Sequence, residues 1–206
     1  MPAPPHNSRT PFIEVDCMFP DRWSPRAFDP TPLSAENLAA LFEAARWAPS
    51  CFNEQPWLFL FAQNERDRDI FLSLLVDKNR SWACRAPLLL FLLTRRHFRS
   101  NGRPNRHAAF DAGAAWMSLS LQARRLGLYA HAMAGFKQDL AYEALNVSRD
   151  DYEIMAAIAV GRYGDAELLS DELLAMEQPN GRKPWDEMAI EGKFFKQKEI
   201  EDKPED

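Results

Sequence analysis

Apolar residues recur along this chain with two different periods, which predict where its helices and strands lie. In some segments they return every three or four positions, as on the buried face of a helix. Other segments are short, continuously apolar runs, as in strands buried on both faces. The predicted helices cover residues 34–47, 66–76, 107–126 and 140–145. The predicted strands cover residues 57–62, 88–94, 128–134 and 154–161. Because helices and strands alternate, we expect a three-layer α+β or α/β domain.

The residues at the ends of the first and third predicted helices support these bounds. Ser34 can cap the first helix with its hydroxyl group, and Pro49 stops that helix. Gly127 is a suitable terminator for the long third helix. That helix also carries alanines at helical spacing, which would let another helix approach closely: Ala108, Ala112 and Ala115.

The length of 206 residues suits a single domain. No internal repeat or linker divides the chain. Residues 1–14 begin with a proline-rich stretch and are predicted to form a flexible leader, and the charged residues 196–206 a frayed tail. Residues 15–195 are therefore the one predicted domain.

Composition narrows the classes of partner. The net charge of −5 gives no electrostatic reason to expect nucleic acid or an anionic membrane. The longest apolar run, residues 86–93, is far shorter than the roughly 20 residues that a membrane helix needs. The three cysteines, Cys17, Cys51 and Cys84, have neither a paired framework nor metal-ligand spacing. We therefore expect a cytoplasmic protein without a nucleic-acid or membrane partner.

The first candidate site is the string Arg22-Trp23-Ser24-Pro25-Arg26. Pro25 favours an extended conformation of Ser24, and alternate residues of an extended segment face the same side. Two guanidinium groups and a hydroxyl would then form a cradle for a phosphate or a polarised carbonyl system. A solvated basic turn is the other interpretation, and from this pattern alone it is the more common one.

Three further segments offer weaker signals. Residues 48–57 join a helix to a strand and carry donors, acceptors and aromatic rings, although an ordinary connection would look the same. Gly135 follows a strand and would let a ligand ring or another backbone approach, or it simply forms a tight turn. Arg182 lies in a basic turn that could close on an anion or remain a surface turn.

Other chemistries lack their sequence patterns. The chain has no G-x-G-x-x-G or G-x-x-x-x-G-K-[ST] loop for phosphates and no G-x-S-x-G elbow for hydrolysis. Its four histidines have no spaced carboxylate or cysteine partners that resemble a metal site. Cys51 has no adjacent base to lower its pKa. Any nucleotide-like cofactor must therefore be bound by residues other than those of a glycine-rich phosphate loop.

Taken together, the order and spacing of these motifs resemble the nitroreductase family of FMN enzymes, from about Phe19 to Phe194. The most specific match is the family's Pro-Ser-Ser-x-Asn-x-Gln-Pro-Trp run, in which Cys51 stands in place of the second Ser. The resemblance implies cofactor contacts at Arg22, Trp23, Ser24 and Arg26 in the opening motif, at Pro49, Ser50, Cys51 and Asn53 in the second motif, at Asn79, at Ala134 and Gly135 in the turn, and at Arg182.

The same resemblance implies a fold, an assembly and a reaction. The fold is α+β, a three-layer α/β/α nitroreductase-like arrangement with a mixed central sheet. FMN lies at the interface of a homodimer, and the second motif comes from the partner subunit. NAD(P)H passes hydride to the flavin N5 and leaves, and a small electron-poor acceptor such as a nitroaromatic or quinone replaces it, so kinetics are ping-pong. No catalytic side chain and no metal is expected.

Two alternatives remain beside this oxidoreductase. The protein could be a flavin-binding, redox-sensing dimer in which Cys51 is the responsive thiol. It could also be an α+β binding domain that holds no cofactor. The first alternative predicts bound flavin without turnover, and the second a colourless protein.

Overall fold

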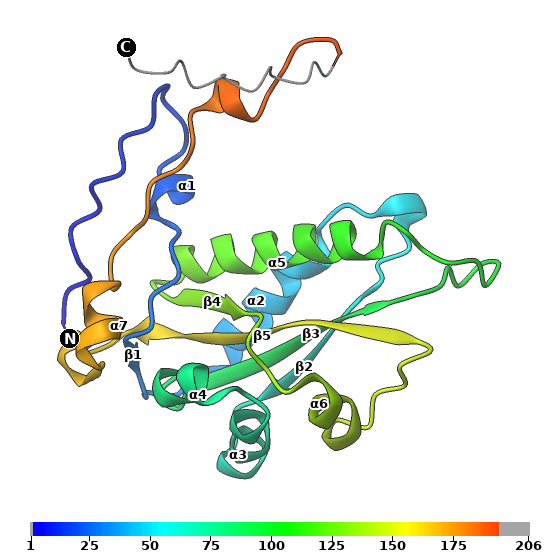
Figure 1. Ribbon diagram of the computed structural model, residues 1–206, viewed down its shortest axis with the longest axis horizontal. Helices are drawn as coiled ribbons and strands as arrows, with labels where there is room; N and C mark the ends of the chain where they lie inside the picture. Colours follow the sequence, from blue (N-terminus) through cyan, green and yellow to red (C-terminus); the bar gives the residue numbers. More distant parts are fainter. Residues whose placement is uncertain (1, 194–206) are drawn as a thin grey trace, which may run out of the picture.

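The centre of the computed structural model, which describes residues 2–193, is a five-stranded sheet (Figure 1). Its strands are β1 (Phe28–Asp29), β2 (Trp57–Ala62), β3 (Leu88–Arg95), β4 (Tyr129–Met133) and β5 (Tyr152–Tyr163). The long strand β5 pairs with β1, β3 and β4, and β2 pairs with β3. The four strands predicted from the sequence are all present, and β1 was not predicted.

Every pair of neighbouring strands within residues 2–193 is antiparallel, so the expected mixed sheet is corrected to an antiparallel one. Two helices, α3 (Glu65–Ser73) and α4 (Asp77–Ala83), link β2 to β3. They return the chain to the end of the sheet at which β2 ends, so β3 begins beside the last residue of β2. One helix, α5 (Ala108–Arg125), links β3 to β4, so these two strands run in the same direction. They are not neighbours, however, because β5 lies between them.

Helices cover both faces of the sheet, as the α+β, three-layer prediction requires. Helices α2 (Ala35–Arg46) and α5 lie on one face, and α3, α4 and α6 (Gln138–Ala144) lie on the other (Figure 1). Alternate residues of β3 point into the two cores, for example Leu90 toward α2 and α5 and Phe91 toward α3. The continuous apolar run that predicted this strand is thus explained by burial on both faces.

Helix bounds follow local capping. The Ser34 hydroxyl accepts a hydrogen bond from the Asn37 N–H (3.1 Å), which confirms the predicted cap of α2. Gly127 follows α5 with φ +71°, as a terminating glycine does. The predicted helix 66–76 begins one residue earlier, at Glu65, because the Asn64 side chain caps it, and it ends at Ser73. The short helices α1 (Met18–Asp21), α4 and α7 (Asp171–Ala175) were not predicted.

The alanine-rich face of α5 is buried within its own chain and is not available for contact with a partner chain. Ala108, Ala112 and Ala115 are buried in the protein's own core, where α5 packs on α2 and on the sheet. The close approach of another helix that these small residues predicted is therefore made by α2 of the same chain. The opposite face of α5 exposes larger apolar groups, above all Phe110, which is 80% exposed.

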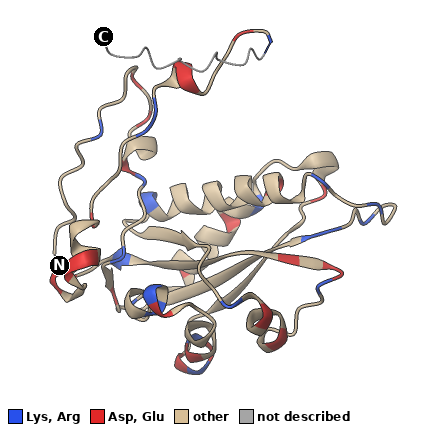
Figure 2. Ribbon diagram, in the orientation of Figure 1, with Lys and Arg blue, Asp and Glu red and all other residues tan. Residues whose placement is uncertain are grey.

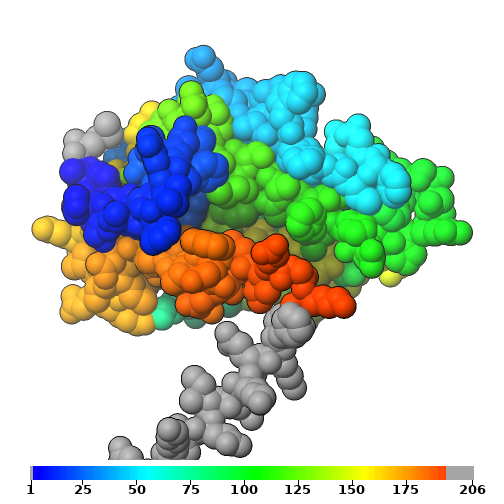
Figure 3. All heavy atoms as spheres, turned by 90° about the horizontal axis from the view of Figure 1, so that it is seen from above, coloured from blue at the N-terminus to red at the C-terminus, as the bar shows by residue number. Residues whose placement is uncertain are grey.

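Two segments extend beyond the sheet at the α1 end, and we call residues 2–17 the N-terminal arm and residues 176–193 the C-terminal arm. They run side by side over part of their length (Figures 1 and 3). The flexibility predicted for residues 1–14 stays a prediction, and the predicted tail 196–206 lies outside the described residues. Within residues 2–193, no helix combines the length and apolar character needed to cross a membrane.

Candidate functional site

An open cavity of about 1270 Å³ lies between the two arms and the α5 side of the sheet. Figure 3 shows the blue N-terminal and orange C-terminal arms flanking the green helix α5. The lining comes from both arms, from α1, from Arg22 and Ser24 of the opening motif, from Trp116 and Met117 of α5, and from Ala132 of β4. Three predicted site residues, Arg22, Ser24 and Arg182, therefore meet in one place.

The opening motif has the alternation that its sequence predicts. Trp23 and Pro25 are buried, whereas Arg22, Ser24 and Arg26 are half-buried and share the other side. The Arg22 Nη1 lies 3.5 Å from the Ser24 hydroxyl oxygen. The Trp23 ring packs in the core among aromatic rings, so only its backbone remains available to a cofactor.

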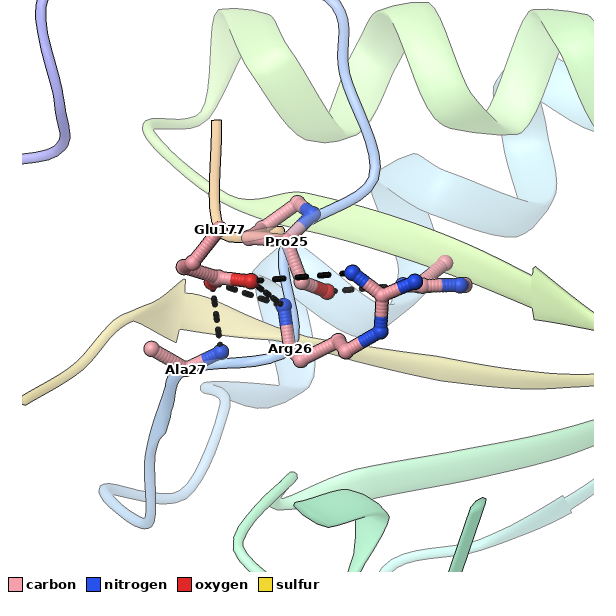
Figure 4. A network of polar contacts seen from close by, with 5 residues as sticks. Pro25, Arg26, Ala27 and Glu177 are labelled. Carbon is pink, nitrogen blue, oxygen red and sulfur yellow. Dashed lines mark hydrogen bonds and ion pairs between the residues drawn. The ribbon is translucent and has the colours of Figure 1, made fainter. Parts of the chain in front are cut away.

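The buried carboxylate of Glu177 holds this motif in place, and no sequence pattern pointed to this residue. It accepts hydrogen bonds from the backbone N–H groups of Arg26 and Ala27, each at 2.8 Å, and lies 3.9 Å from the Arg26 guanidinium (Figure 4). Burial raises the pKa of Glu177, and the bonds from Ala27 and Arg26 oppose that rise. The side chain therefore fixes the start of the C-terminal arm to the opening motif.

Three guanidinium groups, those of Arg9, Arg22 and Arg182, line the cavity, and Asp186 lines it as well. Burial lowers the pKa of Arg22, and the positive charge of Arg182 lowers it further. Burial, Arg182 and then Arg22 lower the pKa of Arg9 in the same way. Within residues 2–193, none of the three takes part in an ion pair. Like charges held together in this way form a site for an anion, which would relieve their repulsion.

Arg9 was missed because it lies in the segment predicted as a flexible leader. Its Nε donates to the carbonyl oxygen of Asn180 (2.6 Å), and its Nη1 donates to those of Pro20 (2.9 Å) and Arg22 (2.8 Å). One side chain thus joins the N-terminal arm, the opening motif and the C-terminal arm. A lone arginine among prolines carries no periodic or spacing signal that could have revealed this role.

The second motif lies at the other end of α5 from the arms (Figures 1 and 3). Its turn, Cys51–Asn53, is anchored by a hydrogen bond from the Cys51 N–H to Asp111 in the first turn of α5 (3.1 Å). The Ser50 hydroxyl accepts from the Gln55 N–H (3.0 Å), and Pro49 is exposed. A single chain therefore does not bring this motif to Arg22 and Arg182.

The family model that matches this chain is described as the nitroreductase family, and it covers residues 20–75 and 62–162. The chain belongs to the nitroreductase family. A crystal structure described as an oxidoreductase containing FMN superposes on this nitroreductase with a TM-score of 0.88 and 39% identity, covering 95% of this chain and 100% of the other. The recognised family and the α+β nitroreductase-like fold are thus confirmed.

Two further relatives resemble this nitroreductase more distantly. A Streptomyces coelicolor protein provisionally named an NADH dehydrogenase/NAD(P)H nitroreductase is 28% identical over 147 residues, 62% of this chain and 73% of that protein. A Desulfovibrio desulfuricans nitroreductase solved in complex with FMN has a TM-score of 0.69 and 24% identity, covering 88% of this chain and 99% of the other. The latter likeness supports the fold.

In this nitroreductase, the Asn79 amide and the turn after β4 contact each other. The Asn79 Nδ2 donates to the Gly135 carbonyl oxygen (3.0 Å). A Cβ atom at Gly135 would lie 2.5 Å from that nitrogen and 2.9 Å from Val76 Cγ2, so close packing alone requires glycine here. Ala134 is exposed and remains open to a ligand.

A histidine that the sequence did not single out lies behind the opening motif. The His131 Nδ1 is 2.8 Å from the Pro25 carbonyl oxygen, and its ring lies 4.6 Å from that of Trp82. Burial lowers the pKa of His131 to about 4, and the nearby Arg26 and Arg22 add to this effect against the bond to Pro25. The ring is therefore neutral near pH 7, with Nδ1 donating to Pro25.

Proposed function

We propose that this protein is an FMN-dependent oxidoreductase that takes electrons from NAD(P)H and delivers them to a small electron-poor acceptor. The observation that carries the proposal is a set of three arginines that line one cavity and form no ion pair within residues 2–193: Arg9, Arg22 and Arg182. The family and the FMN-containing structural relative support the choice of cofactor.

The residues at the cavity fit the phosphate of FMN. A guanidinium group binds phosphate oxygens through two parallel N–H bonds, and the Ser24 hydroxyl adds another donor. The arms and the opening motif supply these donors, so no glycine-rich loop is needed. Arg26 would place positive charge near the pyrimidine edge of the ring, and Glu177 fixes its backbone.

Apolar surface for the flavin ring lies farther along the same cavity, at Trp116, Met117 and Ala132. The exposed backbone at Ala134 would contact the edge of the ring. When bound, FMN supplies the chemistry, because it takes up hydride from a reduced nicotinamide and passes the electrons to the acceptor. The side chains described above bind and orient the cofactor, and none of them is proposed to act as a nucleophile.

We also propose a homodimer in which the second motif completes the partner's cavity. Large apolar side chains are exposed on the arms, on α1 and on α5, and exposed apolar groups of this kind are typical of protein interfaces. They are Phe12, Ile13, Phe19, Phe110, Met117, Trp185, Met188 and Ile190. A two-fold axis near α5 would bring residues 49–53 of each subunit to the arms of the other.

A cytoplasmic location is part of the same proposal. Cys17, Cys51 and Cys84 are all free thiols. Free thiols fit the reducing conditions of the cytoplasm, where disulfides are rare.

An absorption spectrum of the purified protein tests the proposal. FMN is added, unbound flavin is removed, and NADPH or NADH is added without oxygen. We expect flavin bands that survive washing and bleach with the donor, in a protein that elutes as a dimer. Bands that persist would contradict the enzyme and favour the redox-sensing dimer, and a colourless protein would contradict cofactor binding altogether.

A further inference from the structure

Residues 95–107 concentrate positive charge in a chain whose net charge is −5. We call this segment, which links β3 to α5, the basic hairpin. It contains no aspartate or glutamate and includes five arginines, namely Arg95, Arg96, Arg99, Arg103 and Arg106. Figure 2 shows the blue of these residues on the loop that projects beyond the N-terminal end of α5.

The basic hairpin is an ordered turn. The Phe98 N–H donates to the Arg103 carbonyl oxygen (2.9 Å), and the Asn105 N–H donates to that of Arg96 (2.7 Å). Gly102 takes up a left-handed conformation at the tip (φ +68°), which suits a glycine. The arginines therefore stand on a defined backbone, which lowers the entropy lost when they bind a ligand.

Three of the five arginines form no ion pair within residues 2–193, although the Arg106 Nε donates to the His107 Nε2 (3.2 Å). Arg96 forms an ion pair with Glu153 (3.5 Å), and Arg95 donates to the Tyr152 hydroxyl (2.7 Å). The other three are exposed and, as far as residues 2–193 are concerned, form no ion pair: Arg99, Arg103 and Arg106. Guanidinium groups that form no ion pair and stand on a fixed turn suit a phosphate-bearing ligand.

The basic hairpin is fastened to the second motif. The Arg99 N–H donates to the Glu54 carboxylate (2.6 Å), and the Phe98 ring meets the Phe52 ring edge to face, with centroids 6.2 Å apart. The Arg95 N–H donates to the Pro56 carbonyl oxygen (2.9 Å). Wherever residues 49–57 are placed, the basic hairpin must lie beside them.

We propose that Arg99, Arg103 and Arg106 bind the phosphates of the nicotinamide dinucleotide donor and favour NADPH through its 2′-phosphate. This inference rests on the proposed function, in which the second motif completes the partner's cavity. The basic hairpin then lies at the rim of that site, where the adenosine end of a donor extends away from the flavin. Its attachment to the second motif favours this ligand over a nucleic acid, because residues 49–57 border the proposed flavin site.

Calorimetric titration of the FMN-loaded dimer with adenosine 2′,5′-bisphosphate tests the inference without turnover. Adenosine 5′-monophosphate, which lacks the 2′-phosphate, is the comparison ligand. We expect the bisphosphate to bind more tightly, and Arg99→Ala or Arg103→Ala to raise its Kd about tenfold, because each removes a charge-assisted hydrogen bond. Arg103→Lys should recover part of the loss. Arg66→Ala is the matched control, since Arg66 is also exposed but lies on α3, across the sheet.

The outcomes are distinguishable. Equal binding of the two nucleotides, or unchanged Kd values in both alanine variants, would overturn the inference while the flavin spectrum and the dimer stay intact. Variants that lose affinity for an anionic oligonucleotide but keep their affinity for the bisphosphate would also overturn it. A protein that holds no FMN would overturn the proposed function, and this inference with it.

Discussion

The guanidinium of Arg9 donates a hydrogen bond to the backbone carbonyl of Arg22, 2.8 Å away, although both side chains carry the same charge. The contact satisfies a backbone acceptor and leaves both positive charges facing the cavity. A phosphate bound there would receive donors from a residue outside the family's opening motif.

Arg9→Ala should therefore weaken FMN binding about tenfold or more, since a charge-assisted contact to phosphate is lost. Riboflavin, which has no phosphate, should bind both proteins equally. Quenching of flavin fluorescence in titrations of the two ligands gives both constants, with Arg66→Ala as the charge control. A variant that loses the same factor for riboflavin and FMN would show that Arg9 acts only on the fold.

Glu177→Ala should lower the free energy of unfolding by about 2–4 kcal/mol, because two buried N–H groups, those of Arg26 and Ala27, lose their acceptor. Glu177→Gln keeps an acceptor oxygen and should lose less. Urea denaturation of the three proteins measures the difference. An alanine variant as stable as the wild type would contradict the anchoring role of this carboxylate.

His131 should make stability depend on pH between about 6.5 and about 4. Its folded-state pKa is lowered, so the unfolded chain binds the proton first as the pH falls. The stabilisation is complete above pH 6.5 and is lost toward pH 4, by at most about 3 kcal/mol. Denaturation of wild type and His131→Asn at pH 7 and pH 5 checks this, because the asparagine variant should lack this part of the slope. Parallel pH profiles would count against it.

Phe110→Glu should dissociate the proposed dimer and release FMN, because a charge would be placed in the apolar surface of α5. Leu140→Glu is the control, since Leu140 is also an exposed apolar residue but lies on α6, on the other face of the sheet. Light scattering coupled to gel filtration gives the mass of each variant. A dimeric Phe110→Glu protein that keeps its flavin would place the interface elsewhere.

Gly135→Ala should destabilise the protein by about 1–3 kcal/mol, because the new methyl group would overlap the Asn79 amide and the Val76 side chain. Adding Asn79→Ala should recover part of the loss. Thermal unfolding of the apoprotein measures this without any cofactor effect. If the single variant unfolded at the wild-type temperature, the packing explanation for this glycine would fail.

The sequence predicted the elements whose identity is decided locally. The apolar run at 88–94 became β3, and Ser34 capped α2 as expected. Helix α4 escaped prediction because its seven residues are mostly polar and bury only Trp82 and Ala83. The periodicity of α5 revealed its small-residue face but could not say which neighbour that face contacts.

At the site, too, residues that belong to a short sequence motif were predicted, whereas a residue that acts only through a long-range contact was not. Arg22, Ser24 and Arg182 were predicted from motifs, and the structure brings them to one cavity. Glu177 could not be predicted, because it acts on a segment 150 residues away, and 30 acidic residues offered no basis for choosing it. The alternation of burial along the opening motif, in contrast, follows directly from its extended backbone.

The hydrogen bonds of Arg9 to both arms and to the opening motif also determine the stage of translation at which the site can form. Arg9 reaches Asn180, 171 positions later, and the third guanidinium of the cluster comes from Arg182. A ribosome must therefore translate the chain as far as Arg182 before the three guanidinium groups can come together. Truncated products that stop short of this region would remain unable to load cofactor, so a bound flavin would mark a chain whose translation has passed the C-terminal arm.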